Sequence, residues 1–414
     1  MKILHILSQI PAATGSGFYL QATMQQAHLR GHQNYLLAGI TADFPFEQHC
    51  GHLPCADLEL IRFQHDIDLP IVGMSDVMPY PSARFCDLSN TDLLSYEACF
   101  SARLRLAVKR WKPDLIHSHH LWLLTSLARQ KFPQLPLVAS CHGSDLRQFH
   151  TCAHLRESVL RGCATVDAVC ALSAEQKEQI VSTYHIPCDH IHIVGAGYNK
   201  NLFCAPETPP ERNQCINIVY AGKLSRAKGV PCLIRALMKS RHKNWHFHLA
   251  GDGDGEEKNE IINLTRHLGE KVSIHGSINQ TSLARLLKYA HLFVLPSFYE
   301  GVPLVVLEAM VCHCRVITTD LPGIREMYHN LDNSEWLTRI PLPSMHGIDT
   351  PHKKAEVDFI AKLHAAIEHQ LEILSKHSCR LQPPAEFTAI LQYYTWENTF
   401  KRIERVYKTI LSTK

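Results

Sequence analysis

Two glutamates stand in an otherwise apolar stretch, SFYEGVPLVVLEAM, at positions 300 and 308. A carboxylate among Val, Leu, Ala and Met is costly to bury unless a polar group meets it. The preceding HLFVLPS predicts a strand, and Pro303 suits the first turn of the helix that follows. Glu300 is therefore expected in a loop at the carboxyl end of a strand, and Glu308 inside the next helix.

The start of that helix offers free N–H groups at Val302, Leu304 and Val305, together with a partial positive charge. Phosphate groups bind well at such a place. A sugar nucleotide would bring a diphosphate for the amides and ribose hydroxyls for Glu308. The alternative is that Glu308 pairs with a buried Arg or Lys, and the residues alone leave both interpretations open.

A second segment, AGKLSRAKGVP, places Lys223 and Lys228 in a turn between a strand and a helix. Two cations there suit a pyrophosphate leaving group, because they stabilise the charge that develops as the bond breaks. A solvated basic turn is the alternative.

A third segment, SCHGSDLRQF, places His142 at the end of another strand, where it is expected to position a substrate hydroxyl. A capping or core histidine is the alternative for His142. The loop Gly15-Ser16-Gly17 lacks bulky side chains, and Gly17 would allow close approach of a phosphate.

The elements that must position these residues alternate between apolar strands and amphipathic helices, which predicts parallel sheets. The expected strands of the first half are KILHIL, NYLLAGI, DLIHSH, PLVASCH, AVCALS and IHIVGAG. After a proline-rich linker at 204–215 the pattern restarts with INIVYAG, WHFHLAG, VSIHG, HLFVLPS and CRVITTD. The fold class is therefore α/β, with two doubly wound Rossmann-like domains whose sites lie at the carboxyl ends of the strands, facing a central cleft.

We place the first domain at 1–205 and the second at 206–394. A final amphipathic helix at 395–414 is expected to pack back on the first domain. Its apolar face comprises Trp396, Phe400, Ile403, Val406 and Tyr407. The stretch 44–90 is rich in Pro, His and Asp and reads as irregular.

The composition excludes several classes of protein. A net charge of +3 over 414 residues lacks the large positive excess that is typical of nucleic-acid-binding proteins. The 15 cysteines show no metal spacing and are typical of reduced thiols in a cytoplasmic protein. The opening MKILHILSQIP reads as a strand and not as a signal peptide. The basic segment SARLRLAVKRWK is a candidate for peripheral contact with the inner face of an anionic membrane, although a solvated helix face is the simpler interpretation.

Taken together, these segments resemble the family-4 retaining glycosyltransferases (glycosyl transferases group 1), which have the GT-B fold. The most specific element is the pair of glutamates in PSFYEGVPLVVLEAM. Supporting segments, in the same order as in the family, are DLIHSHH, VASCHGSD, AGKLSRAKG, LAGDGDGEE, TTDLPGIREM and the final TWE helix.

The resemblance implies a role for each matching residue. Glu308 would bind the ribose hydroxyls, and Glu300 would lie near the transferred sugar and the leaving phosphate. Lys228 matches the diphosphate lysine, whereas Lys223 stands where the family usually has arginine, which weakens bidentate phosphate contact. His142 matches the histidine that lines the donor-sugar pocket.

Further donor-binding positions follow from the same resemblance. Gly17 matches the second glycine of the family's pair, although Ser16 replaces the first. Gly276 would lie near the base. The remaining expected donor contacts, at the start of the helix that carries Glu308, are Gly301, Val302, Pro303 and Leu304.

The implied reaction transfers a sugar, with retention, from a nucleotide-diphosphate donor, UDP-sugar being favoured, to the hydroxyl of a glycan, lipid-linked or small-molecule acceptor. Neither a metal nor another cofactor is expected. A sugar-nucleotide epimerase of the same fold and a non-catalytic nucleotide-sugar-binding protein remain as alternatives. A dehydrogenase is disfavoured, because no G-x-G-x-x-G opens the first helix.

Overall fold

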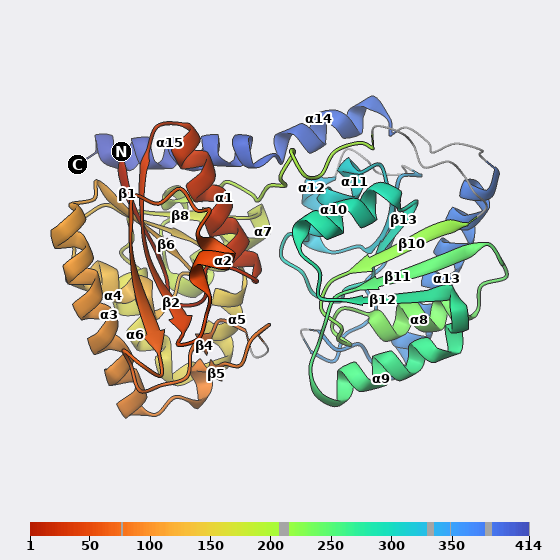
Figure 1. Ribbon diagram of the computed structural model, residues 1–414, viewed down its shortest axis with the longest axis horizontal. Helices are drawn as coiled ribbons and strands as arrows, with labels where there is room; N and C mark the ends of the chain where they lie inside the picture. The colour runs from red at the N-terminus through yellow and green to blue at the C-terminus, as the bar shows by residue number, and fades with distance from the viewer. Residues whose placement is uncertain (76–77, 207–214, 329–334, 348, 377–382, 414) are drawn as a thin grey trace. The chain divides into compact units, whose positions relative to one another are not determined.

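The chain divides into two compact units, as seen in a computed structural model (Figure 1). Unit 1 comprises Met1–Ala196 and Trp396–Lys414, and unit 2 comprises Gly197–Thr395. The structure describes residues 1–75, 78–206, 215–328, 335–347, 349–376 and 383–413. Most of the expected linker, at 207–214, lies outside these residues.

The sheet of unit 1 is parallel, in the strand order β3-β2-β1-β6-β7-β8-β9. Its strands are β1 (Lys2–Leu7), β2 (Gln33–Thr41), β3 (Asp57–Phe63), β6 (Leu115–His119), β7 (Leu137–Ser140), β8 (Ala168–Ala171) and β9 (Ile191–Ile193). The short strands β4 (Val72–Gly73) and β5 (Ala83–Arg84) pair separately. Strands β6, β7 and β8 are buried along their whole length, as expected where helices cover both faces of a parallel sheet.

Some helices of unit 1 begin at side-chain caps. Thr14 accepts the Gly17 N–H at the start of α1, and Ser89 forms a capping box with Asp92 at the start of α3. The α-helices are α1 (Gly15–Leu29), α2 (Phe46–Cys50), α3 (Asn90–Trp111), α4 (Leu123–Lys131), α5 (Ser144–Thr151), α6 (Arg156–Cys163), α7 (Ala174–Tyr184) and α15 (Trp396–Ser412). Single 3-10 turns are η1 (Phe85–Asp87), η2 (Ala153–Leu155) and η3 (Cys188–His190).

Unit 2 repeats the plan with a parallel sheet in the order β12-β11-β10-β13-β14-β15. Its strands are β10 (Ile216–Ala221), β11 (Trp245–Ala250), β12 (Val272–Gly276), β13 (Leu292–Leu295), β14 (Arg315–Thr319) and β15 (Leu337–Ile340). Its helices are α8 (Val230–Met238), α9 (Gly255–Thr265), η4 (Arg266–Lys271), α10 (Gln280–Tyr289), α11 (Leu304–Val311), α12 (Pro322–Met327), α13 (Lys353–Lys376) and α14 (Ala385–Tyr393). These two sheets confirm the predicted α/β fold class.

The strand order reverses once in each sheet. In unit 1 the chain builds β2 and β3 on one side of β1 and the later strands on the other side, beginning with β6. In unit 2 the same reversal falls between β10 and β13. Ligand sites of open parallel sheets lie outside the carboxyl ends of the strands at such reversals. The reversals therefore mark one place in each unit where functional side chains are expected.

The final helix packs on unit 1, as predicted. Helix α15 lies against α1 (Figure 1), and its expected apolar face of Trp396, Phe400, Ile403, Val406 and Tyr407 is buried. Arg402 Nε donates to the Val194 carbonyl at 2.8 Å, which fixes the helix along the end of the sheet. Unit 2 is thus an insertion between the sheet of unit 1 and the last helix of unit 1.

Two expectations were wrong in detail. The stretch 44–90 is not irregular throughout, because it contains α2, β3 and the β4–β5 pair. The segment Gly15-Ser16-Gly17 is not a loop before a helix but the first turn of α1. Gly17 is required there for packing, since a Cβ would lie 2.7 Å from the Ala12 nitrogen.

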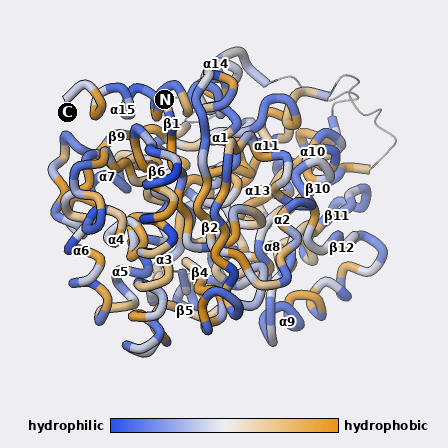
Figure 2. Tube along the Cα trace, turned by 60° about the vertical axis from the view of Figure 1, so that its left-hand side comes forward, coloured by the Kyte–Doolittle hydropathy of each residue, from blue (hydrophilic) through white to orange (hydrophobic). Residues whose placement is uncertain are grey.

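Each unit has its own apolar core. The surface helices carry both hydrophobic and hydrophilic residues along their length, as the alternating colours of α3 and α9 show (Figure 2). No helix in the part of the chain that the structure describes is long and apolar enough to cross a membrane.

Candidate functional site

Lys228 and Glu300 are brought together by unit 2. Lys228 follows β10 and Glu300 follows β13, the two strands at the reversal. Lys228 Nζ lies 2.6 Å from Glu300 Oε1 and donates to the Tyr299 carbonyl at 3.3 Å. Ser297 Oγ donates to the same Glu300 oxygen at 2.9 Å. The loops after β10 and β13 thus join a cation and a carboxylate whose side chains remain partly open to solvent.

Gly229 explains why these loops can meet. It has a φ of +67° and caps α8, and a Cβ at this position would lie 2.1 Å from the Pro296 carbonyl oxygen. Only glycine allows so close an approach in a left-handed conformation. The approach of the Lys228–Gly229 turn to the β13 loop therefore depends on a residue without a side chain.

Lys223 and Gly276 lie in neighbouring loops of the same sheet edge. Lys223 is exposed after β10, and its carbonyl accepts a hydrogen bond from the Tyr220 hydroxyl at 2.7 Å. Gly276 ends β12 with a φ of +64°, and its carbonyl accepts the Gly251 N–H at 2.8 Å. The loops that carry the two lysines and this glycine follow strands on the same side of the β10/β13 reversal.

Helix α11 begins at Leu304, so Pro303 is its cap and not a residue of its first turn. No side chain caps this helix. The Val306 N–H donates to the Pro303 carbonyl at 3.0 Å, so the donors expected for a ligand are the N–H groups before Val306. Gly301 and Val302 form the loop before it. Gly323 packs against that loop, since a Cβ there would lie 2.1 Å from the Gly301 carbonyl oxygen.

Glu308 is 7% exposed and points from the fifth position of α11 into the unit. Burial raises the pKa of its carboxyl group to about 8. Among the described residues, none forms an ion pair or hydrogen bond with this side chain. Arg315, a buried arginine of the same unit, donates to Gln370 and to the Glu335 carbonyl. An ion pair of Glu308 with a buried Arg or Lys is therefore not observed among the described residues, and the ribose-binding role of Glu308 stays a prediction.

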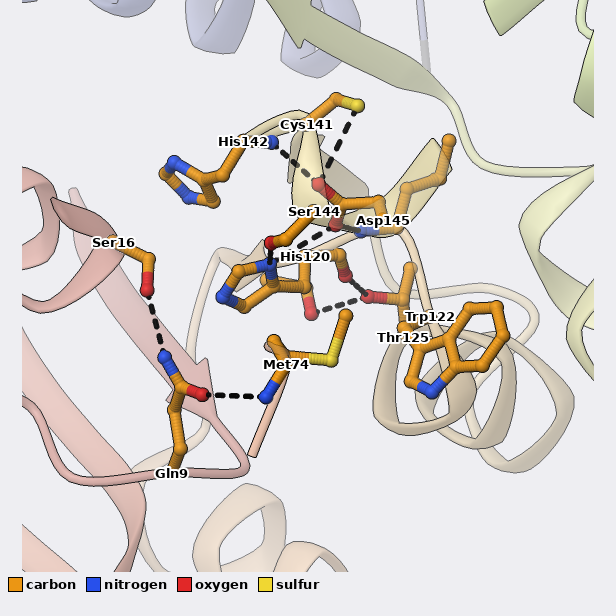
Figure 3. Close-up of polar contacts among 12 residues, drawn as sticks. Gln9, Ser16, Met74, His120, Trp122, Thr125, Cys141, His142, Ser144 and Asp145 are labelled. Atoms are coloured by element: carbon orange, nitrogen blue, oxygen red, sulfur yellow. Dashed lines mark hydrogen bonds and ion pairs between the residues drawn. The ribbon is translucent and has the colours of Figure 1, made fainter. Parts of the chain in front are cut away.

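His142 belongs to unit 1, in the turn between β7 and α5 (Figure 3). Its ring lies edge-on to Tyr19, with centroids 5.0 Å apart, and edge-on to His120 at 4.8 Å. Burial lowers the pKa of His142 to about 3, and the neighbouring His120 contributes in the same direction. His142 Nε2 is buried with no hydrogen-bond partner among the described residues.

Asp145 organises the turn that carries His142, and sequence reasoning assigned it no role. Its Oδ2 accepts the His142 backbone N–H at 2.6 Å, and its Oδ1 accepts the Leu121 N–H at 2.7 Å (Figure 3). The same Oδ1 lies 3.1 Å from His120 Nδ1. Desolvation alone would raise the pKa of Asp145, but His120 and His142, including the His142 backbone N–H, hold it well below its ordinary value. Asp145 therefore positions the two loops that follow β6 and β7.

The Gly17 segment is held by a separate set of hydrogen bonds (Figure 3). Buried Gln9 donates to Ser16 Oγ at 2.8 Å and accepts the Met74 N–H at 3.1 Å. The Gly17 N–H donates to Thr14 Oγ1 at 3.0 Å. The Gly17 N–H is thus already used within the chain. The contacts support a packing role for Gly17.

The basic helix α3 is partly neutralised within unit 1. Arg103 pairs with Glu59 and Asp66, and Arg110 pairs with Asp57. These ion pairs favour the simpler interpretation of this helix, a solvated face packed beside the edge strand β3.

A cluster of buried histidines at the other reversal was also missed. His5 on β1 and His117 and His119 on β6 are at most 1% exposed. The only signal in the sequence was the alternation of histidines in LIHSHH. His5 joins them through strand register, because β1 and β6 pair His5 with His117.

Comparisons with known sequences match both halves of the chain. Residues 14–202 match the family described as Glycosyltransferase Family 4, and residues 215–340 match the family described as Glycosyl transferases group 1. An uncharacterized glycosyltransferase of Methanocaldococcus jannaschii is 25% identical over 314 residues, covering 67% of this chain and 78% of the relative. A D-inositol 3-phosphate glycosyltransferase of an Arthrobacter species is 25% identical over 285 residues, covering 62% and 66%. The match to the glycogen synthase of Mycobacterium tuberculosis, at 26% identity, covers 54% of this chain and only 56% of that enzyme.

Solved structures show the same architecture. Sucrose-phosphate synthase from Thermosynechococcus elongatus has a TM-score of 0.73 at 18% identity, with all of both chains covered. Anabaena HepE, solved in complex with UDP and glucose, has a TM-score of 0.67 at 17% identity, covering 99% of this chain and 100% of HepE. At these identities the likeness establishes the fold.

Proposed function

Because this chain belongs to the family-4 glycosyltransferases of the GT-B fold, we propose that it transfers a sugar from a nucleotide diphosphate to an acceptor hydroxyl with retention of configuration. Its activity as a glycosyltransferase follows from the family. The donor class, the stereochemical course and the independence from metal are the content of the proposal.

The observation that carries the donor assignment is the unpartnered carboxyl group of Glu308. It is buried, and its pKa of about 8 leaves it protonated at neutral pH in the ligand-free protein. Such a group both donates and accepts hydrogen bonds. A pair of ribose hydroxyls offers the complementary set of donors and acceptors, and their binding would offset the desolvation of the carboxyl group.

The neighbouring groups suit the rest of a nucleotide-diphosphate sugar. The uncapped start of α11 provides N–H donors for a phosphate, and Lys228 provides a cation at the same strand reversal. That HepE was solved with UDP and glucose supports a UDP-sugar as the first donor to examine.

In the proposed reaction the bond between the sugar C1 and the diphosphate oxygen breaks while the acceptor oxygen bonds to C1 on the same face. The leaving phosphate oxygen takes the proton of the acceptor hydroxyl. Lys228 stabilises the negative charge that develops on the diphosphate, and Lys223 adds a second cation. Glu300 holds Lys228 in place before the donor binds, through the 2.6 Å ion pair.

We assign acceptor binding to unit 1, with a glycan, a lipid-linked glycan or a small molecule as the acceptor. His142 is kept neutral by burial, so it can accept or donate one hydrogen bond to a sugar hydroxyl without adding charge. We further propose that the protein works in the cytoplasm, where nucleotide sugars are the expected donors.

A thermal-shift screen with UDP, GDP and ADP sugars tests the donor assignment. The wild type is expected to be stabilised by one nucleotide class, and Glu308→Ala is expected to lose that response while remaining folded. Glu386→Ala, which removes an exposed carboxylate of the same unit, serves as the control. Unchanged nucleotide affinity in Glu308→Ala, with a much lower Tm, would return Glu308 to a purely structural role.

Metal independence is tested with the donor and acceptor identified in this way. Since the lysines supply the positive charge, EDTA is expected to leave the transfer rate unchanged. A strict requirement for added Mg²⁺ or Mn²⁺ would refute this part of the mechanism, whichever donor is used.

A further inference from the structure

Three histidines of unit 1 converge on one face of the sheet, at the reversal between β1 and β6. His5 comes from β1, and His117 and His119 come from alternate positions of β6. Their ring centroids lie 4.6–6.0 Å apart. One ring nitrogen of each lies within 4.8 Å of the corresponding nitrogen of the other two. The proposed transfer reaction uses none of these side chains.

The orientation of His5 is fixed by Asn34. The Asn34 side-chain amide donates to the Met24 carbonyl at 2.7 Å and to the Pro54 carbonyl at 3.0 Å. Its oxygen is therefore the atom that faces His5 Nε2, at 3.1 Å, and His5 must donate there. A neutral His5 then carries its lone pair on Nδ1. This Nδ1 is buried without a partner among the described residues.

His117 has a similarly defined tautomer. The Tyr407 hydroxyl lies 2.6 Å from Nδ1, and Ser140 Oγ lies 2.8 Å from Nε2. Since a phenol is a good donor, Nδ1 accepts from Tyr407 and Nε2–H donates to Ser140. Metal-binding histidines are held in this way, by a second hydrogen bond from the ring nitrogen that does not bind the ion.

His119 is the least satisfied member. It is 1% exposed, and both of its ring nitrogens are buried without a partner in the described chain. A neutral imidazole needs one acceptor and one donor, so burying both nitrogens unmet is unfavourable. The ring stacks on His142 at 5.6 Å and contacts Tyr19 by its edge, but neither contact meets its nitrogens.

We propose that His5, His117 and His119 bind one divalent transition-metal ion, with Zn²⁺ as the preferred ion. Three neutral imidazoles suit Zn²⁺, Cu²⁺, Ni²⁺ and Fe²⁺, and they suit Mg²⁺ or Ca²⁺ poorly. Zn–N bonds of about 2.0–2.1 Å require the ligand atoms to draw closer than they are without the ion. Tyr407 must also release the His117 lone pair on binding.

Such an ion would fasten β1 and β6 to each other, because its ligands come from both strands. Its role would be structural, because full burial leaves no access for a sugar donor. A buried water would be the fourth ligand. The cysteine spacing that argued against a metal site in the sequence has no bearing on this site, since no cysteine takes part. The metal independence proposed for the transfer reaction concerns the diphosphate and is unaffected.

The test measures metal content and not activity, so its outcome is separate from that of the proposed function. The full-length chain is unfolded with chelator, refolded with or without Zn²⁺, and passed through a desalting column before elemental analysis. We expect about one Zn²⁺ per chain and a Tm higher by about 5 °C in the loaded protein. His119→Leu is expected to lose both.

His248→Leu is the matched control, because His248 belongs to a separate, partly exposed histidine group on β11 and β12. His248 Nδ1 lies 3.1 Å from His275 Nε2, so this group can also collect Zn²⁺ adventitiously. Retention of Zn²⁺ in His248→Leu together with its loss in His119→Leu supports the buried site. The reverse pattern, or equal retention in both variants, refutes it.

If His119→Leu fails to fold, absorption spectroscopy of the Co²⁺-loaded protein provides a second test. Wild-type protein refolded with Co²⁺ is expected to show the strong visible absorption of a four-coordinate cobalt site, and His5→Gln is expected to abolish it. Wild-type protein that takes up neither Zn²⁺ nor Co²⁺ refutes the proposal and assigns the unmet nitrogens to buried water.

Discussion

The two units place different chemistry at equivalent points of the same sheet plan. At the reversal of unit 1 stand buried imidazoles, with His5, His117 and His119 at most 1% exposed. At the reversal of unit 2 stands a charged pair that solvent still reaches, with the side chains of Lys228 and Glu300 26% and 17% exposed. A shared topology thus fixes where polar side chains gather, while the residue types decide what they can bind.

Burial shifts pKa values in both units, but it lowers the pKa of a histidine in unit 1 and raises the pKa of a glutamate in unit 2. Desolvation is the largest cause both of the lowered pKa of His142, about 3, and of the raised pKa of Glu308, about 8. Both groups are therefore neutral at pH 7. As the pH falls, the histidine protonates in unfolded unit 1 but not in folded unit 1, so unit 1 loses stability. As the pH rises, the glutamate ionises in unfolded unit 2 before it does so in folded unit 2, so unit 2 loses stability.

The largest expected effect is that of Glu308→Gln on the stability of ligand-free protein. The usual carboxyl pKa of 4.5 is raised to about 8 in the folded unit, so between these values only the unfolded state is ionised and stability falls with rising pH. Glutamine removes that loss. We expect the variant to be more stable than wild type by about 3 kcal/mol at pH 7, and the difference to shrink by about 1.4 kcal/mol per pH unit on acidification.

Urea unfolding of unit 2 between pH 5.5 and 8 measures this difference, with Glu386→Gln as the exposed control. A variant less stable than wild type at pH 7 would mean that an internal cation holds the Glu308 carboxylate. The opposite pH dependence of the two units would then disappear, because a carboxylate paired with a cation would not have a raised pKa.

The next effect concerns the charged pair. Lys228→Ala removes the cation that faces Glu300 and is expected to lower turnover by about 10²-fold or more, the scale of losing one preorganised donor. Steady-state kinetics with the identified donor and acceptor measures it. Lys258→Ala removes an exposed lysine of the same unit, paired with Asp252, and should leave turnover near wild type. Full activity of Lys228→Ala would place the lysine outside the site.

A smaller effect is expected in unit 1. Since the pKa of His142 falls from 6.5 to about 3 on folding, the wild type loses stability as pH drops below 6.5, and His142→Asn lacks this contribution. His142 keeps some exposure, so we expect the stability difference to change by about 1 kcal/mol between pH 7 and pH 5. Thermal melts across this range test it, and His154→Asn, at an exposed position, is the comparison. Parallel pH profiles for wild type and His142→Asn would contradict the prediction.

The smallest effect tests the one departure from the family pattern in unit 2. Lys223→Arg supplies a planar fork that matches phosphate oxygens, so donor affinity is expected to rise by about 2–3-fold. Calorimetric titration with the nucleotide diphosphate measures it. Weaker binding would show that donor affinity at this position depends on the shape of the side chain and not on its charge alone.

Local patterns were sufficient for most of the fold. Apolar runs such as KILHIL and INIVYA became β1 and β10, and the spacing of Trp396, Phe400 and Tyr407 predicted the buried face of α15. Strand β3 was missed because DLELIRF interleaves charges with apolar residues at the sheet edge, where β3 has only one neighbour. Edge strands carry a weaker hydrophobic signal than central strands.

Long-range contacts account for what the sequence left open at the sites. Whether Glu308 had an internal partner could not be predicted from spacing alone, and neither could the hydrogen bond of the buried Arg315 to Gln370. The histidine cluster depended on the register that sets His5 beside His117. Neither relation can be derived from one segment, because each joins parts of the chain that meet only when the sheet forms.

Helix α15 has a consequence for the order in which the molecule can be made. On the ribosome, the strands of unit 1 emerge first, but the helix that covers them emerges only after all of Gly197–Thr395. Until then His117 lacks its Tyr407 partner, and the surface that receives Phe400 and Ile403 remains bare. Unit 1 of the nascent chain must therefore remain without its last helix until unit 2 has been synthesised.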